Sequence, residues 1–432
     1  MEMLPVAPPR FCPDFVFKKQ FNMCDMYPFS NTTPCAPCAP PSRKRRAECG
    51  PSLAGDDDSD DYAISNLQKA TQTIIPMEAE TNRKLAMELS WLAYLDYGEA
   101  VDKKTNNFNF FANNNPAGVT DLVGYTVIDY FEVKHAGSGT PPSNYVYLVE
   151  TPTKDLFVVV RGTDPSLGIL GLIEQVTAED LKLAPVATNP NWKTPAGGAP
   201  PSGMLIATGT STGSQDILQI QGNLIKGKSL IATIQAKIAA AATAPKIMCV
   251  GHSLGGTLTF ALPPQIQADT AATHAVDATH SKVYWMNFAG ATPGNVALAA
   301  FLADFELNPG FSRVWNVFDL VPRLWDASLM ANHYQFLYKQ YFKYPSMAVY
   351  PGRADSAGLI PKFIKDTQKD TTGYTHPGEN DPAIYPFASI PPPTTGLFGG
   401  PAHWTKCVES QHSHYNYLVA VGGVVPAGYP KA

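Results

Sequence analysis

A serine between glycines, directly after a short apolar run, is the first residue of this sequence that could do chemistry. Gly251-His252-Ser253-Leu254-Gly255 follows the apolar residues 246–250, and a helical pattern begins at Gly256. A sharp turn from a buried strand into a helix lifts a serine hydroxyl above a sheet, and flanking glycines leave room for that turn. The pattern alone also fits an ordinary glycine-rich connection. The strand before it and the helix after it favour Ser253 as a nucleophile.

A nucleophilic serine needs hydrogen-bond donors for the oxyanion that develops on the attacked carbonyl. Arg161-Gly162-Thr163-Asp164 ends the run 156–160, which reads as a buried strand. Thr163 should therefore lie at the carboxyl edge of a sheet, where the sites of α/β proteins are found. We expect its backbone N–H, with its hydroxyl, to act together with the N–H of Leu254. The alternative is a simple turn that closes the strand.

Four motifs, taken in order, resemble the class 3 (fungal-type) lipase family. They are Arg161-Gly162-Thr163, then the residues 251–256, then Phe288-Ala289-Gly290-Ala291-Thr292-Pro293-Gly294-Asn295, then Asn316-Val317-Phe318-Asp319-Leu320-Val321-Pro322. The resemblance covers roughly residues 80–330 and the carboxyl-terminal helix. It implies an α/β-hydrolase fold, hydrolysis of carboxylic esters, and a Ser, Asp, His triad in that chain order. It also implies an oxyanion donor at the position of Thr163.

The resemblance places the triad acid at Asp319, after a strand expected around residues 314–318. A carboxylate in this role orients the imidazole and stabilises its cation. A different interpretation is that Asp319 only starts the turn before Val321-Pro322. Asp326 is a poorer rival because it lies beyond this turn.

A triad histidine must follow Asp319, which leaves His333, His376, His403, His412 and His414. The family places this histidine shortly before a terminal helix with a Tyr-Leu or Tyr-Phe pair, here Tyr417-Leu418. On one continuous helix over residues 405–421, His412 and His414 would point about 200° apart, so only one would face Ser253. Helical periodicity does not choose between them, and the resemblance favours His412. We expect His333 to be structural and His252 to support the nucleophile.

Strands that alternate with helices must position these groups. Apolar residues at helical spacing predict one helix over residues 78–98 and another over 216–242. Strand patterns occur at residues 126–133, 145–150, 156–160, 246–250, 281–288 and 311–318. The alternation predicts an α/β fold with a mostly parallel central sheet flanked by helices, in a domain over residues 78–432.

Two stretches of this domain exceed what the bare fold requires. Residues 165–215 are rich in Gly, Pro, Ala and Thr and contain the apolar segment 167–173. This segment is expected either to form a lid that opens at a lipid surface or to pack in the core. The irregular residues 340–402 are expected to form a second insertion that walls the pocket.

The composition excludes several classes of protein. The 432 residues are 44% hydrophobic and 16% charged, as in a globular protein. Lys and Arg number 32 against 37 Asp and Glu, so no basic surplus favours a nucleic-acid partner. The longest apolar stretches are too short for a transmembrane helix, which needs about 18 residues.

The first 62 residues read as a flexible tail. Residues 1–55 hold ten of the 39 prolines and five of the seven cysteines, and a basic run at 43–46 precedes an acidic run at 56–61. Opposite charge blocks without apolar periodicity usually stay solvated. The cysteine spacing lacks the two paired Cys-x-x-Cys units of a zinc site, so we expect neither metal nor cofactor.

These observations predict a serine ester hydrolase with Ser253, Asp319 and His412 as its triad. The expected substrates are acylglycerols or other lipid esters, reached through transient contact with a lipid interface. One alternative keeps the triad but acts as a phospholipase A1 or as a short-chain or aryl esterase. Another is an inactive hydrolase-fold protein that binds a lipid or a partner. The amino terminus has no visible signal peptide, which favours a cytoplasmic location but leaves export without a signal open.

Overall fold

The computed structural model of the chain describes residues 77–95, 97–108, 122–133, 144–163, 183–185, 192, 194, 199–271, 283–306, 313–316, 319–326, 374 and 411–423. The chain divides into two units, Met1–Asp58 and Ser59–Ala432, and every described residue lies in the second. The predicted tail over residues 1–62 and the apolar segment 167–173 lie outside the described residues. Of the predicted insertion over residues 340–402, only Tyr374 is described.

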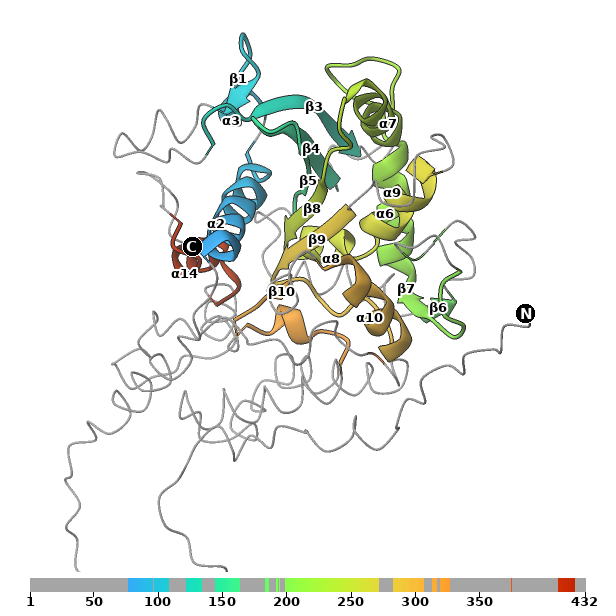
Figure 1. Ribbon diagram of the computed structural model, residues 1–432. Helices are drawn as coiled ribbons and strands as arrows, with labels where there is room; N and C mark the ends of the chain where they lie inside the picture. The colour runs from blue at the N-terminus through green and yellow to red at the C-terminus, as the bar shows by residue number, and fades with distance from the viewer. Residues whose placement is uncertain are drawn as a thin grey trace, which may run out of the picture. The chain divides into compact units, whose positions relative to one another are not determined.

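An eight-stranded sheet runs through the described fold in the order β1-β2-β3-β4-β5-β8-β9-β10 (Figure 1). Its strands are β1 (Val101–Asp102), β2 (Asn107–Phe108), β3 (Thr126–Val133), β4 (Asn144–Glu150), β5 (Leu156–Val160), β8 (Ile247–His252), β9 (Val283–Phe288) and β10 (Arg313–Val314). A second, two-stranded sheet pairs β6 (Leu183–Pro185) with β7 (Leu205–Ala207). The α/β class predicted from the alternating patterns is confirmed.

The large sheet is mixed, and its two halves follow from the lengths of the connections. The described strands from β1 to β5 pair antiparallel, whereas β5, β8, β9 and β10 pair parallel. Five residues, 151–155, join β4 to β5, which is enough for a hairpin but too few for a crossover. Between β5 and β8 the chain forms α6 (Thr208–Gln219) and α7 (Leu230–Ala240), which provide such a crossover. The parallel half contains the ends of β5 and β8, where Thr163 and Ser253 follow.

Alternate side chains of the central strands pack in two separate cores, one on each face of the sheet. On one face Tyr145, Tyr147 and Val149 of β4 lie in a cluster with α2 (Met77–Leu92) and α14 (His414–Ala420). On the other face Val146 and Leu148 lie with α6, α7, α8 (Leu254–Thr259) and α9 (Leu262–Ala271). Successive side chains of a strand point to opposite faces of the sheet. The runs of β4 and β5 are apolar at every position, so helices must bury both faces.

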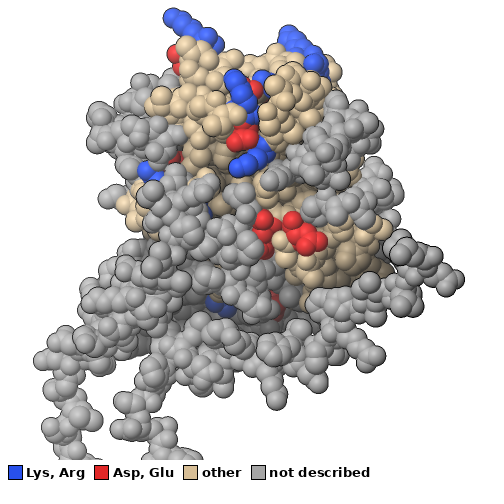
Figure 2. Space-filling view, in the orientation of Figure 1, with Lys and Arg blue, Asp and Glu red and all other residues tan. Residues whose placement is uncertain are grey.

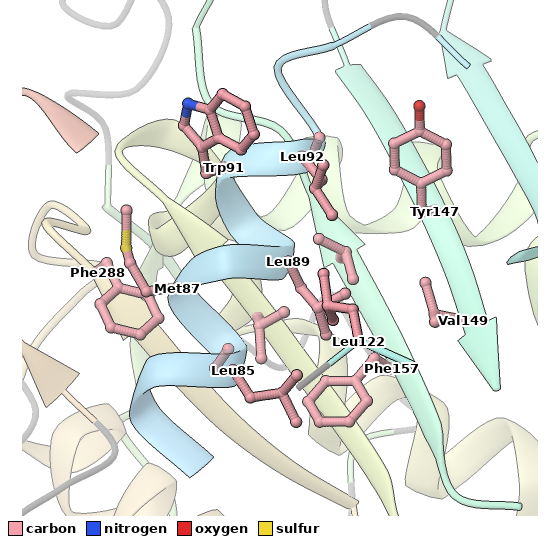
Figure 3. Packing of buried hydrophobic residues seen from close by; sticks show 14 of the residues in the cluster. Leu85, Met87, Leu89, Trp91, Leu92, Leu122, Tyr147, Val149, Phe157 and Phe288 are labelled. Carbon is pink, nitrogen blue, oxygen red and sulfur yellow. The ribbon is translucent and has the colours of Figure 1, made fainter. Parts of the chain in front are cut away.

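Helix α2 is anchored to the sheet by a row of buried apolar side chains. Figure 3 shows Leu85, Leu89 and Leu92 of α2 beside Tyr147, Val149 and Phe157 of the sheet. Burying one such side chain stabilises the fold by about 1.5–3 kcal/mol. The helix is therefore a rigid support for the turn that follows it at residues 93–95.

The prediction of one helix over residues 216–242 is wrong. The chain forms α6 and α7 instead, separated by a turn in which Gly227 has a φ of +78°. The buried carboxylate of Asp129 accepts hydrogen bonds from the backbone N–H groups of Leu224 (2.8 Å) and Ile225 (3.1 Å). A carboxylate from a distant strand thus stabilises a turn that the helical pattern does not indicate. The helix predicted over residues 78–98 likewise ends earlier, at Leu92, before the short α3 (Tyr97–Ala100).

The described residues show few charged side chains on the face drawn in Figure 2. Lys and Arg there lie mainly toward the upper end with a few Asp and Glu beside them, and a separate group of Asp and Glu lies nearer the middle. Within the described residues, no helix is both long enough and apolar enough to cross a bilayer.

Candidate active site

Ser253 occupies a strained turn between β8 and α8. Its φ of 60° and ψ of −127° lie in a region that residues other than glycine rarely adopt. Its backbone N–H donates to the carbonyl of Phe288 on β9 at 2.9 Å, which fixes the turn against the neighbouring strand. The side chain is 3% exposed. The strand-turn-helix predicted around this serine is present.

The glycines around Ser253 are required by close contacts between backbones. A Cβ on Gly255 would overlap the carbonyl oxygen of Val160 and lie 2.8 Å from the backbone of Arg161. A Cβ on Gly251 would lie 2.5 Å from the carbonyl carbon of Gly255. The absence of these side chains lets α8 begin directly against the end of β5.

Replacing Gly255 with alanine should therefore destabilise the fold by about 3 kcal/mol, because the added methyl group meets backbone atoms that cannot rotate away. Chemical denaturation of the variant would measure this loss. Gly203→Ala is the matched control: its Cβ would have no neighbour within 4 Å, and only its φ of +78° opposes the change. Equal losses in the two variants would contradict the steric explanation.

A hydrogen-bonded chain joins Ser253 to His412 and Asp319. His412 Nε2 lies 2.8 Å from Ser253 Oγ, and His412 Nδ1 lies 2.8 Å from Asp319 Oδ2. Asp319 is fully buried, and its Oδ1 accepts from the N–H of Val321 at 2.9 Å. Since an ionised carboxylate only accepts, the proton of a neutral His412 belongs on Nδ1. Nε2 is then free to accept the hydroxyl proton of Ser253.

The rival acid Asp326 is not part of the hydrogen-bonded contacts between Ser253, His412 and Asp319. Asp326 ends the turn after Asp319, where its charge acts on the guanidinium of Arg323. Burial lowers the pKa of Arg323 to about 10, and the charges of Asp319 and Asp326 oppose that shift. His333, His376 and His403 lie outside the described residues.

The assumption of one continuous helix through His412 and His414 is wrong. Ser413 has extended backbone (φ −63°, ψ 134°) and caps α14, which begins at His414. Both histidines therefore lie on the same side: the ring centroid of His252 is 4.8 Å from that of His412 and 5.7 Å from that of His414. The His414 ring stacks on Tyr94, and burial and the nearby charge of His412 lower the pKa of His414 to about 3.

Tyr417 and Asn316 complete the surroundings of Asp319, and sequence reasoning did not assign them to the site. The Tyr417 hydroxyl donates to Asp319 Oδ2 at 2.8 Å and accepts from the N–H of Asn316 at 2.9 Å. Burial, and next the charge of Asp319, raise the pKa of Tyr417 well above its ordinary value, so the hydroxyl keeps its proton. The Asn316 amide donates to Gln411 Oε1 at 2.8 Å and so binds the acid segment to the residue before His412. The sequence signal that could have pointed to Tyr417 was the Tyr417-Leu418 pair, which served only to locate His412.

Tyr417→Phe should lower kcat about tenfold with little change in KM, because it removes a hydrogen bond to the charged Asp319, a contact worth about 1.5–3 kcal/mol. Steady-state kinetics on a soluble ester would measure this loss. Tyr415→Phe, two residues earlier on the same helix, is the control and should keep the parent kcat, since the hydrogen bonds to the Asp319 carboxylate among the described residues come from His412, Val321 and Tyr417. An unchanged kcat in Tyr417→Phe would show that the bonds from His412 and Val321 are enough to hold Asp319.

Thr163 lies beside the serine turn. Strands β5 and β8 are parallel with Val160 opposite Gly251, so the residues after each strand come together at the same edge. A Cβ on Gly162 would lie 3.0 Å from Ser253 Cβ. Thr163 Oγ1 is buried and has no hydrogen-bond partner among the described residues. Leu254 is the first residue of α8 and directly follows the serine.

Comparisons with known proteins agree with this fold. The family model described as lipase (class 3) matches residues 157–328, a range that contains Thr163, Ser253 and Asp319 and ends before His412. No curated protein sequence matches the chain. The crystal structure of M37 lipase aligns with a TM-score of 0.55 at 18% identity, over 79% of this chain and 93% of that chain.

Two further lipase structures align less well. Nonglycosylated LIP2 lipase of Yarrowia lipolytica aligns with a TM-score of 0.41 at 15% identity, over 58% of this chain and 75% of that chain. A triacylglycerol lipase described as having a serine protease triad at its catalytic centre aligns with a TM-score of 0.37 at 17% identity, over 56% and 73% of the two chains. The chain is thus similar to class 3 lipases over residues 157–328, and its fold is similar to that of M37 lipase.

Proposed function

We propose that the protein is a serine hydrolase that cleaves carboxylic esters through Ser253, His412 and Asp319. The observation that carries this proposal is the chain of two 2.8 Å contacts from Ser253 Oγ through His412 to the buried Asp319. The strained backbone of Ser253 is a second support, since strain of this kind concentrates at functional sites. The match of residues 157–328 to the class 3 lipase family model agrees with ester hydrolysis.

The reaction would proceed in two halves. Ser253 Oγ attacks the ester carbonyl while His412 Nε2 takes the hydroxyl proton, and Asp319 stabilises the imidazolium. The N–H groups of Thr163 and Leu254, with the Thr163 hydroxyl, would hold the oxyanion. When the tetrahedral intermediate collapses, His412 returns the proton to the departing alcohol and an acyl-serine remains. Water then attacks the acyl-serine, again with His412 as base, and releases the carboxylic acid and free Ser253.

The proposed substrates are acylglycerols or other lipid esters, met at a lipid interface. The support for this class is the family and the lipase fold rather than a described acyl pocket. Fold does not determine substrate, so the ester class needs its own test.

A fluorophosphonate probe tests the chemistry without assuming a substrate. The folded protein should be phosphonylated once, and peptide mapping by mass spectrometry should place the adduct on Ser253. Ser229→Ala is a matched control, because Ser229 caps α7 outside this hydrogen-bonded chain and its loss should leave labelling intact. A folded protein that the probe does not label would support the inactive, lipid-binding alternative.

Rates on esters of increasing acyl length, with and without an emulsified interface, test the substrate class. A lipase should prefer long acyl chains and gain rate at the interface. Activity confined to short soluble esters would identify an esterase. Release of the sn-1 acyl group from phospholipid, in preference to acylglycerol, would identify a phospholipase A1.

A further inference from the structure

Tyr94 lies in the turn that ends α2 and contacts two segments of the site. Its hydroxyl is 3.0 Å from His252 Nδ1, at the end of β8. Its ring stacks on the ring of His414, with centroids 4.7 Å apart and planes 8° apart. The amino-terminal helix thus reaches both the serine turn and the histidine segment, in agreement with the contacts between α2 and both β8 and α14 (Figure 1).

The Tyr94 hydroxyl also lies over the segment that follows β5. A Cβ on Gly162 would overlap this hydroxyl and would lie 3.0 Å from Ser253 Cβ. Gly162 directly precedes Thr163. The glycine therefore leaves the space that one hydroxyl fills, between the proposed oxyanion donor and the serine turn.

His252 transmits this contact to His412. The two rings lie 4.8 Å apart and are tilted by 34°, and the Tyr417 ring meets His252 edge-on at 5.4 Å. Burial first, and then the charges of His412 and His414, lower the pKa of His252 well below its ordinary value, so its imidazole is neutral. A hydroxyl can either donate or accept, so Tyr94 can satisfy Nδ1 in either neutral tautomer.

Lateral support matters for His412 because its helical stretch ends before Ser413, so His412 is not part of α14. The extended Ser413 separates it from α14, whereas α2 is anchored by its buried apolar row (Figure 3). A ring that rotates away from Ser253 cannot take its proton. A misplacement of about 1 Å can reduce the rate of such a reaction about a hundredfold.

We propose that Tyr94 is a positioning residue for the histidine segment: its hydroxyl holds His252 against His412, and its ring holds His414. This inference rests on the proposed role of His412 as base. Two substitutions of Tyr94 separate the role of the hydroxyl from that of the ring. Phenylalanine keeps the stacked ring and loses only the hydroxyl, whereas leucine loses both.

Steady-state kinetics and fluorophosphonate labelling of the full chain test this assignment. Tyr94→Phe should lower kcat about three- to tenfold, the size of one modest hydrogen bond, while KM changes less than about twofold. Tyr94→Leu should lower kcat about a hundredfold, as expected for a misplaced base. The rate of phosphonylation should fall in parallel with kcat.

Tyr97→Phe is the matched control for Tyr94→Phe. Tyr97 lies three residues further on and its hydroxyl donates to Asn106 Oδ1, while its ring stacks on Tyr130. This variant should keep the parent kcat. Thermal unfolding of each variant separates lost rate from lost folded protein.

Three outcomes would be decisive. A parent protein with no Ser253-dependent labelling would overturn the proposed function itself. An active parent with folded Tyr94 variants at parental kcat would overturn only the role of Tyr94. A low kcat in Tyr94→Leu together with the parent kcat in Tyr94→Phe would overturn the role of the hydroxyl and leave the stacked ring as the support.

Discussion

Ser253→Ala is expected to lower kcat on any ester substrate about a million-fold, as removal of the nucleophile does in serine hydrolases of known mechanism. The physical reason is that the Ser253 oxygen contacts His412 Nε2 and stands at the strained turn between β8 and α8. Without it, His412 can at best activate a water molecule. Alanine keeps the Cβ, so the packing of the turn should change little.

Three measurements would check this result. Ester hydrolysis should fall to the background rate, fluorophosphonate labelling should vanish, and thermal unfolding should stay close to that of the parent. A variant that loses activity but unfolds at the parent temperature has lost the chemistry and kept the structure. Residual turnover above about one part in a thousand of the parent rate would mean that another residue is the nucleophile.

His412→Ala is expected to cause a loss as large as that of Ser253→Ala, about a million-fold in kcat, because the two act as one unit. His414→Ala should lower kcat no more than about tenfold. The difference follows from geometry: His412 Nε2 is 2.8 Å from Ser253 Oγ, whereas the His414 ring is stacked on Tyr94. His414 thus contributes packing, and its loss weakens a stacked pair worth about 0.5–1.5 kcal/mol.

The two single variants and the double variant distinguish the roles. If His412 is the base, adding His414→Ala to His412→Ala should cost little more, since the residual rate no longer depends on the position of the imidazole. Added imidazole should restore part of the activity in His412→Ala and none in Ser253→Ala. A larger loss in His414→Ala than in His412→Ala would contradict the assignment of the base.

Local patterns predicted the parts of the site in which neighbours along the chain determine the structure. The glycines around Ser253, the apolar run before it and the helix after it all lie within about fifteen residues. Strands β3 and β5 have the predicted bounds because their burial alternates or is continuous over a few residues. One failure has a tertiary cause, because a buried group from far along the chain changed the local preference. Asp129 of β3 stabilises the turn that divides residues 216–242 into two helices.

The choice of base shows where such reasoning ends. His412 is 93 residues from Asp319 and 159 from Ser253, so no local pattern connects them. Periodicity on a continuous helix could not choose between His412 and His414, and the premise itself was wrong because Ser413 interrupts the helix. The resemblance to a family favoured His412, and its contacts with Ser253 and Asp319 are seen only once the chain is folded.

Residue types and short-range spacing were therefore sufficient for the α/β class, the serine turn and the strand end that carries Thr163, because backbone sterics and apolar burial act over a few residues. Tertiary packing alone decided which histidine meets Ser253 and which hydroxyls surround it. Tyr94 and Tyr417 come from opposite ends of the described chain, and each reaches a site residue at hydrogen-bond distance. Hydrogen bonds between such distant groups depend on how the sheet and its two helical layers pack, and that packing places α2 and α14 side by side.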